Sequence, residues 1–532
     1  MKKSYPALIA LLGIVIGVMG VLTFQSVGGR KTLKASYADW RKLNLVLQTL
    51  EENYVDTIDY AKVTDAAIAS SLASLDPHSV YLPPRDLEAA ESDLAGNFDG
   101  IGIQFNVPND TAVVIEVIPG GPSEKIGLQP GDRILKVDDK VIAGVRFPQD
   151  SMVHRMRGPR GSKVTITVKR GPETIPFDII RDKIPVNSLD AAFMFDDSTG
   201  YIRVSKFAKS TIDEMVEACN KLLDQGMEYL MLDLRDNGGG FFDQAIYISE
   251  LFLKKGAEIV YLEGNRRQRI DYKSGGRGGL QDLGLSVLIN ENSASSSEIV
   301  AGAIQDNDRG VIVGRRSFGK GLVQEPFYFN DGSGFRITVA RYHTPSGRCI
   351  QKPYSSEEDY LYDIYDRYNH GEMLVADSIR VDRSVEYHTV GGRVVYGGGG
   401  IVPDVFVPID TTRASAFYQS CSKKATAMRF ASAYFDGHKA ELGKIAGFDE
   451  LLLYLDRAGL EQKFLDFAES RDGIRPASEG EWASERSYMM TSVRALVGRY
   501  SKLGDTAFYR IYLDIDTVFK EAMAHRGPVP AE

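Results

Sequence analysis

Cysteine is scarce in this sequence. The 532 residues include three cysteines, Cys219, Cys349 and Cys421, and no two of them have the close spacing of a zinc site. This odd and widely spaced set argues against a disulfide framework and against a zinc knuckle. A protein with so few cysteines is compatible with a reducing cytosol and with a cell envelope, so the cysteine count does not indicate in which compartment the protein resides.

Positive charge is also in short supply. Lys and Arg number 63 against 72 Asp and Glu, a net charge of −9, which argues against nucleic acid or another polyanion as the main partner. The chain has no HExxH motif, no carboxylate pair at metal spacing and no dinucleotide fingerprint, so we expect no metal and no cofactor. Hydrophobic residues make up 43% and charged residues 25%, as in a folded globular protein of about three or four domains.

The N-terminus carries an apolar run. Lys2 and Lys3 precede Ala7–Phe24, which is uncharged and about as long as the shortest membrane-spanning helices. The residues that follow, Gln25-Ser26-Val27, form no small-x-small cleavage site, which favours an uncleaved anchor over a cleaved signal peptide. Everything after Gly29 is then expected outside the inner membrane.

Changes of pattern divide the chain into parts. A helical pattern gives way to alternating apolar and polar residues between Gly and Pro turns, then to alternating strands and helices, and then to helices again. The predicted parts are an anchor at 1–30, a helical segment at 31–92, a β domain at 93–184, an α/β core at 185–410 and a helical region at 411–532. Within the core, Glu357–Gly400 is predicted to be loop and insertion. The last part is predicted to be a separate helical appendage.

Serines cluster between a predicted strand and a predicted helix within Ser286–Gln324. A serine at such a junction is exposed, and the first free backbone N–H groups of the helix can stabilise an oxyanion beside it. The next strand-like segment brings Lys320, flanked by Gly319 and Gly321 in an apolar run, where burial would lower its pKa. The pattern predicts a serine nucleophile with a lysine base.

The same residues also fit two patterns that involve no serine nucleophile. Ser295 with Glu298 three residues later satisfies a capping box, which on the local sequence accounts for the pattern as well as catalysis does. Gly314–Lys320 also matches the start of a phosphate-binding loop. Against that loop, Gly321 replaces the magnesium-binding Ser or Thr, the following residues resemble a strand, and the acidic strand end at Asp233 comes before it rather than after it.

A histidine base is not favoured. None of the seven histidines lies in a recognisable active-site motif. His78 and His343 are expected to satisfy hydrogen bonds of turns and strands near the core.

A series of motifs runs through the chain. They are LDPHS at Leu75–Ser79, GIGI at Gly100–Ile103 with GGPSEKIGLQPGDRILKVD after it, LDLRDNGGG at Leu232–Gly240, SASSSE at Ser293–Glu298, FGKGLVQ at Phe318–Gln324, TPSGRCIQ at Thr344–Gln351 and GIVPD at Gly400–Asp404. In these motifs the sequence resembles the carboxy-terminal processing peptidases, the tail-specific serine proteases of family S41, over most of its length. The resemblance implies a ββα-spiral (ClpP/crotonase-like) α/β core with an inserted PDZ domain, an N-terminal helical segment and a C-terminal helical region.

The resemblance also implies catalytic roles. Ser295, the middle serine of SASSSE, corresponds to the family's nucleophile, with Ser293 and Ser297 as rivals. Lys320 corresponds to the general base. Gln324, four residues later, corresponds to the residue that holds the lysine amine in line.

The family's oxyanion donors correspond to a backbone N–H at Gly239 or Gly240 and to the N–H of Ser296. Two positions depart from the family pattern. Gly238 replaces a usual proline, which makes this loop less rigid, and Ser296 replaces a frequent alanine, which should not disturb attack by its neighbour.

The PDZ-like segment is expected to bind substrate tails. Gly100, Ile101, Gly102 and Ile103 can present backbone N–H groups to a terminal carboxylate while the adjacent strand pairs with the tail. The same residues also fit an ordinary alternating strand, and both interpretations can hold. Arg157 is interpreted as a solvated surface charge rather than as a sensor of ligand.

Together these inferences predict a serine endopeptidase that recognises C-terminal tails and cleaves with Ser295 and Lys320. One membrane span would hold it in the inner membrane, with the catalytic part in the periplasm. The alternative is a non-catalytic, membrane-tethered PDZ adaptor for protein C-termini. A protease gated by its own PDZ domain is an intermediate case. Expected partners are proteins with exposed C-termini, an activating protein and, through helices after Thr411, a second copy of the chain.

Overall fold

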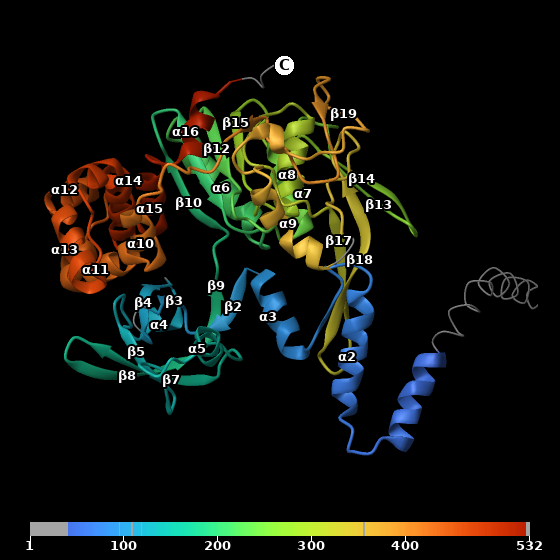
Figure 1. Ribbon diagram of the computed structural model, residues 1–532, viewed down its shortest axis with the longest axis horizontal. Helices are drawn as coiled ribbons and strands as arrows, with labels where there is room; N and C mark the ends of the chain where they lie inside the picture. The colour runs from blue at the N-terminus through green and yellow to red at the C-terminus, as the bar shows by residue number, and fades with distance from the viewer. Residues whose placement is uncertain (1–40, 95, 108–109, 119, 355–356, 528–532) are drawn as a thin grey trace, which may run out of the picture. The chain divides into compact units, whose positions relative to one another are not determined.

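The computed structural model describes residues 41–94, 96–107, 110–118, 120–354 and 357–527 (Figure 1). The chain divides into two compact units, one ending at Ser74 and one beginning at Leu75. The first unit holds a helix over residues 41–53 and helix α2 (Tyr60–Ala73). The Asp59 side chain caps α2 by accepting a hydrogen bond from the N–H of Lys62, so the predicted helical pattern is present here.

The apolar run Ala7–Phe24 lies outside the described residues. Within the described part of the chain, no helix is both long and apolar enough to cross a membrane. The anchor therefore stays a prediction from the sequence.

In the second unit, a two-stranded ribbon marks where one domain is inserted into another. β2 (Asn97–Gly100) pairs antiparallel with β9 (Asp182–Pro185), so that Asn97 lies opposite Pro185 and Gly100 opposite Asp182. The chain leaves and returns at one place, as an inserted domain requires.

The inserted domain is a small β structure with two short helices. Its elements are β3 (Ile103–Asn106), β4 (Ala112–Val117), α4 (Pro122–Lys125), β5 (Arg133–Val137), β6 (Lys140–Val141), α5 (Gln149–Met156), β7 (Lys163–Arg170) and β8 (Glu173–Ile180). The sheet has the order β3-β4-β5-β7-β8, with β6 paired to β5. Alternate strand residues such as Ile134, Ile166 and Val168 join Met152 of α5 in a buried core.

A six-stranded sheet forms the centre of the larger domain. Its strands are β10 (Leu189–Met194), β11 (Thr199–Val204), β12 (Tyr229–Asp233), β15 (Gly284–Ile289), β16 (Val311–Gly314) and β21 (Val405–Phe406), in that spatial order. β10 and β11 are antiparallel, and the other neighbours are parallel. This is the α/β core that the sequence predicts.

Helices cover both faces of this sheet. Successive strand residues point to opposite faces, so Leu232 packs with α6 (Thr211–Leu223), α7 (Phe242–Phe252) and α8 (Ser296–Asp306), whereas its neighbour Met231 packs with Phe519. Phe519 lies on α16 (Thr517–Ala524), the last helix of the chain. The expectation that the whole C-terminal region is a separate appendage is therefore wrong for α16, which completes the core, and for Tyr509 of α15 (Gly504–Tyr512), which packs in the same cluster.

A second sheet lies beside the first in the larger domain. Its strands are β1 (Val80–Leu82), β13 (Glu258–Gly264), β14 (Arg267–Lys273), β17 (Leu322–Tyr328) and β18 (Gly334–His343), all antiparallel, and helix α3 (Pro84–Leu94) follows β1. β17 begins two residues after Lys320. The helix that a phosphate-binding loop needs at this point is replaced by a strand, as the sequence predicts.

The segment Glu357–Gly400 is more ordered than the predicted loop. It begins with helix α9 (Glu357–Asn369) and includes the paired short strands β19 (Tyr387–His388) and β20 (Val394–Val395). Arg367 of α9 is buried, pairs with Glu372, and donates to the carbonyl oxygens of Arg316 and Ser317. The segment thus holds the backbone just before Lys320.

The remaining C-terminal helices have a core of their own. They are α10 (Ala416–Lys423), α11 (Thr426–Leu442), α12 (Phe448–Arg457), α13 (Leu460–Asp472), α14 (Glu479–Gly498) and α15 (Gly504–Tyr512). Phe430, Phe464 and Val493 are among the buried residues at their centre. A helical region follows the core, as the sequence predicts.

Replacing Phe519 by alanine tests whether α16 belongs to the core. The buried ring contacts Phe195 and Tyr201 at centroid distances of 4.6 and 5.9 Å. We expect Phe519→Ala to lower the free energy of unfolding by about 3–5 kcal/mol, measured by chemical denaturation with circular dichroism. The matched control is Phe329→Ala, because Phe329 is exposed. Equal unfolding of both variants would contradict the assignment of α16 to the core.

Candidate active site

Three parallel strands of the six-stranded sheet end at the same edge. β12 ends at Asp233, β15 at Ile289 and β16 at Gly314, and each is followed by a loop that carries predicted site residues. In open α/β sheets, ligands bind at the carboxyl ends of the strands. Here the edge borders a cleft of about 970 Å³, lined by Ser295, Lys320 and the three glycines that precede α7.

Ser295 sits on a strained turn between β15 and α8. Its φ of 55° and ψ of −113° lie outside the regions that L-residues commonly occupy. Such strain persists only where surrounding contacts fix it, and it is frequent at active sites. A serine placed on a sharp strand-to-helix turn has its hydroxyl exposed for attack, which is the arrangement of known nucleophile elbows.

The rival serines are already used as hydrogen-bond donors. Ser293 Oγ donates to the carbonyl oxygen of Leu234 at 2.8 Å, and Ser297 Oγ donates to that of Asn237 at 2.9 Å. Both side chains are buried, whereas Ser295 lines the cleft. This difference favours Ser295 among the serines, although its role as nucleophile stays a prediction.

Glu298 joins the loop of Ser295 to the loop of Lys320. Its buried carboxylate accepts from the N–H of Ser295 at 2.8 Å, the N–H of Gly319 at 2.7 Å, the N–H of Lys320 at 2.9 Å and the hydroxyl of Ser317 at 2.5 Å. Burial raises the pKa of Glu298 above its usual range, and the hydrogen bonds from these four donors offset only part of that rise. The glutamate half of the predicted capping box is therefore present, and the same carboxylate also fixes the lysine loop.

Tyr342 of β18 is a second link between the two loops. Its buried hydroxyl lies 3.1 Å from the carbonyl oxygen of Ser295 and 2.5 Å from that of Lys320. Burial raises the pKa of Tyr342, so the hydroxyl keeps its proton and can donate. Nothing in the local sequence around Tyr342 indicates this position.

Lys320 is half-buried on the same cleft. Burial lowers the pKa of its amine, and the positive charge of Arg336 lowers it further, while Glu298 and Asp76 act in the opposite direction. The net shift is downward, as the sequence predicts. A lysine with a lowered pKa supplies more of the neutral amine that a general base requires.

The glycine loop, Gly238–Gly240, lies against the turn of Ser295. A Cβ atom added to Gly239, whose φ is +99°, would stand 2.8 Å from Ser295 Cβ and 3.0 Å from Ser296 N, so only glycine fits there. The N–H of Gly239 donates to Asn237 Oδ1 at 2.9 Å, which leaves Gly240 as the other predicted glycine donor. Ser296 is the first residue of α8, so its N–H has no acceptor within the helix.

Gln324 lines the cleft but lies toward a different partner. Its Nε2 is 3.4 Å from Thr338 Oγ1, and that hydroxyl donates to Asp76 Oδ1 at 3.1 Å. Asp76 also accepts from the hydroxyl of Ser79 at 2.6 Å. The LDPHS motif thus reaches the active-site cleft through this chain of contacts, and the predicted hold of Gln324 on the lysine amine stays a prediction.

His78 and His343 both make hydrogen bonds near the core, as the sequence predicts. His78 Nε2 lies 2.7 Å from the Tyr360 hydroxyl, and His343 Nδ1 lies 3.1 Å from the carbonyl oxygen of Gly347. Burial and then the charge of Lys320 lower the pKa of His78 to about 4. His78 is therefore neutral at physiological pH, close to the predicted base.

The predicted tail-binding loop joins the ribbon to the edge of the inserted sheet. Gly100 ends β2, Ile103 begins β3, and Ile101 and Gly102 lie between them. β3 is the terminal strand in the order of the described sheet, so one of its edges is open to an added strand. Arg157, expected to be a solvated surface charge, is half-buried, and its guanidinium lies over the Phe98 ring, 4.4 Å from the centroid.

Glu298→Gln tests the link between the two loops. In wild type, each oxygen of the Glu298 carboxylate accepts from at least one backbone N–H group. In the variant, the –NH₂ group of the glutamine replaces one of these oxygens, so at least one backbone N–H group faces another donor. We expect a loss of about 1–3 kcal/mol in unfolding free energy, measured by denaturation. Glu325→Gln is the control, since Glu325 is on the following strand and pairs only with Arg267 among the described residues. Equal stability of the two variants would contradict the role given to Glu298.

The sequence matches two family descriptions, Peptidase family S41 over residues 198–360 and PDZ domain over residues 100–180. A probable CtpA-like serine protease of Staphylococcus haemolyticus (strain JCSC1435) is 32% identical over 354 residues, 65% of this chain and 71% of that protein. One of Staphylococcus epidermidis (strain ATCC 12228) is 31% identical over 354 residues, with the same coverage.

Among solved structures, the photosystem II D1 C-terminal processing protease is similar at 30% identity and a TM-score of 0.36, over 58% of this chain and 83% of that one. The identity to the staphylococcal proteases extends over more than two thirds of their length. The resemblance seen in the motifs is thereby confirmed. The chain belongs to peptidase family S41 and is a serine-type peptidase with a PDZ domain.

Proposed function

We propose that this chain is an endopeptidase of the cell envelope that recognises exposed C-terminal tails of proteins and cleaves them with a Ser295/Lys320 dyad. The observation that carries the proposal is the shared carboxylate of Glu298, which accepts from the N–H groups of both Ser295 and Lys320 beside one cleft. The lowered pKa of Lys320 and the strained turn that places Ser295 at the cleft support the two roles.

In this mechanism, Ser295 Oγ attacks the carbonyl carbon of the scissile bond while neutral Lys320 accepts the hydroxyl proton. The N–H groups of Ser296 and of the glycine loop stabilise the oxyanion. When the C–N bond breaks, the leaving amine takes the proton from Lys320 and an acyl-enzyme remains. Water then attacks the ester, with Lys320 again as the base, and Ser295 is released.

The tail would bind as an added strand at the open edge of β3, with its carboxylate at the loop from Gly100 to Ile103. The apolar run behind Lys2 and Lys3 supports an anchor in the inner membrane, with the catalytic part in the periplasm. An activating protein, and a second copy bound through the helices after Thr411, belong to the same proposal. A pure adaptor would have no need of the lysine and serine loops held together at a cleft.

Cleavage of an unfolded test protein decides the proposal. The full chain in detergent, incubated with a substrate that ends in an apolar tail, should cleave it, and Ser295→Ala and Lys320→Ala should each lose at least about 10³-fold in kcat. Ser346→Ala is the control variant and should keep the wild-type kcat, because Ser346 does not line the cleft. Cleavage by Ser295→Ala at the wild-type rate would rule out the nucleophile.

The tail requirement is read from the same assay. A substrate with the same body and a charged tail should be cleaved with a higher KM, because the PDZ loop loses its ligand. Tail binding without any cleavage by wild type would favour the adaptor.

The pH dependence of cleavage tests Lys320 as base. Because a base acts in its neutral form, the rate should rise with pH and reach half its maximum below the ordinary lysine pKa of 10.5. Arg336→Gln removes a positive charge that lowers this pKa, so the rising limb should move to higher pH and the rate at neutral pH should fall. Arg341→Gln, a charge change on the same strand, should leave the limb in place. An unshifted profile in Arg336→Gln would contradict the base assignment.

A further inference from the structure

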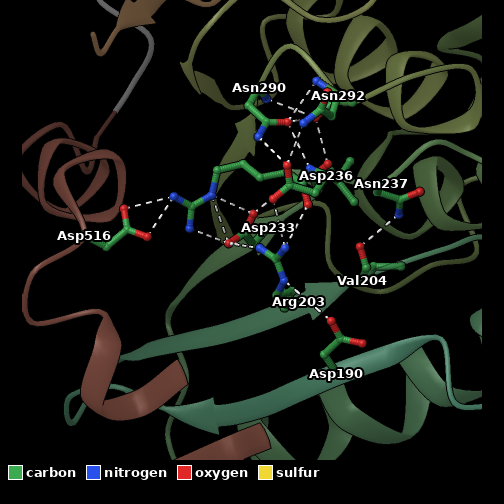
Figure 2. Close-up of polar contacts among 12 residues, drawn as sticks. Asp190, Arg203, Val204, Asp233, Asp236, Asn237, Asn290, Asn292 and Asp516 are labelled. Atoms are coloured by element: carbon green, nitrogen blue, oxygen red, sulfur yellow. Dashed lines mark hydrogen bonds and ion pairs between the residues drawn. The ribbon is translucent and has the colours of Figure 1, made fainter. Parts of the chain in front are cut away.

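A cluster of charges surrounds the end of β12, where the loop toward the glycines begins (Figure 2). At its centre is Asp233, the last residue of β12, which is fully buried and accepts from the Tyr201 hydroxyl at 2.7 Å. Arg203 reaches the same carboxylate at 3.0 Å and Arg235 at 2.6 Å. Burial alone would raise the pKa of Asp233, but the two guanidinium groups hold it below its usual range.

Arg235 has a second carboxylate partner far along the chain. Its NH1 lies 2.9 Å from Oδ1 and 2.8 Å from Oδ2 of Asp516, which is 281 residues away. Asp516 is the N-cap of α16 and also accepts from the N–H of Phe519 at 2.9 Å. In Figure 2, Asp516 and Asp233 lie along one row of ion pairs.

The loop that begins at Arg235 contacts the nucleophile loop at several points. Asp236, with a φ of 61°, accepts from the side-chain amides of Asn290 at 2.8 Å and Asn292 at 3.0 Å (Figure 2). The carbonyl oxygen of Asn237 accepts from the N–H of Ala294 at 3.0 Å. A shift of this loop therefore changes where the oxyanion donors stand relative to Ser295.

The two arginines of the cluster differ in the carboxylates that they contact. Besides Asp233, Arg203 pairs with Asp190 at 3.6 Å and with Asp236. Among the described residues, Arg235 pairs only with Asp233 and Asp516. Without the charge of Asp516, Arg235 would therefore compete with Arg203 for the one buried carboxylate that both contact. Arg203 also contacts Asp236 at 3.4 Å and the carbonyl oxygen of Arg235 at 3.1 Å, so the competition would act directly on the glycine loop.

We propose that Asp516 is a positioning residue for catalysis: through Arg235 it fixes the glycine loop against the nucleophile turn. This inference rests on the proposed peptidase mechanism. It places the end of the chain, outside the residues that match the S41 family, in control of the oxyanion site.

The variant Asp516→Asn separates the ion pair of Asp516 with Arg235 from its function as the N-cap of α16. Asparagine caps helices as well as aspartate does, and the apolar packing of α16 through Val518, Phe519 and Ala522 is untouched. We expect kcat to fall about tenfold, which corresponds to about 1.4 kcal/mol of transition-state stabilisation, with KM nearly unchanged and a fall of the melting temperature too small to unfold the chain at the assay temperature. A fall of the melting temperature in proportion to the activity would show a merely structural role.

Hydrogen–deuterium exchange of the full chain supplies a readout that needs no activity. In Asp516→Asn, exchange of residues 235–241 should become faster, while residues 426–442 of α11 keep their wild-type rates. If exchange becomes faster but kcat stays normal, Asp516 fixes the loop without affecting catalysis, and the proposed catalytic role is wrong. If neither exchange nor kcat changes, Asp516 does not fix the loop at all. An inactive wild type would contradict the proposed peptidase function instead.

Two variants complete the design. Asp456→Asn removes an ion pair of 2.7 Å with Arg494 between α12 and α14, and it should leave kcat and the exchange of residues 235–241 as in wild type. Asp516→Ala removes the cap as well as the charge, so it should lose kcat as Asp516→Asn does and lose stability in addition. Equal kinetics for Asp456→Asn and Asp516→Asn would overturn the proposal.

Discussion

One buried carboxylate determines how the loops of Ser295 and Lys320 meet. Glu298 accepts from three backbone N–H groups and one hydroxyl that belong to two different loops. A carboxylate is an acceptor only, so it can satisfy all these donors at once without competing for a proton. Ser295 and Lys320 follow different strands of the sheet, and their distance depends on this junction and on the Tyr342 hydroxyl.

Segments outside the matched peptidase region support both loops from behind. The loop of Lys320 is supported by Arg316, Glu372 and Arg367, and the glycine loop by Asp233, Arg235 and Asp516. Buried ion pairs add little net stability once desolvation is counted, but their fixed geometry orients the backbone next to them. The insertion with α9 and the final helix α16 therefore have a role in positioning as well as in packing.

Much of this arrangement follows from the sequence, because local patterns specify it. Alternating apolar residues predict the strands of the core, and LVQEPFYF predicts the strand after Lys320. The serine turn, the lysine and the glycine loop are recognisable because they form contiguous motifs. In the sequence Glu298 resembles only a helix cap, since its bonds to Gly319 and Lys320 join residues that are distant along the chain.

Other features needed the fold itself. Tyr342 and Asp516 carry no local signal, because their partners lie on other elements. Periodicity predicts the C-terminal helices, but it does not say which surface an amphipathic helix covers, so it cannot separate α16 from the appendage. The many Tyr and Asp residues of α9 give a weak helical pattern, and for this reason the sequence predicts a loop there.

The ribbon of β2 and β9 has a consequence for how the PDZ domain could arise or be exchanged. Both ends of the inserted segment lie side by side, with Asn97 opposite Pro185. A short turn could join these two positions and leave the strands of the central sheet in place, since the sheet contains no residue of the insert. The PDZ domain is thus a module that can be replaced as a whole, while the peptidase core keeps its own connectivity.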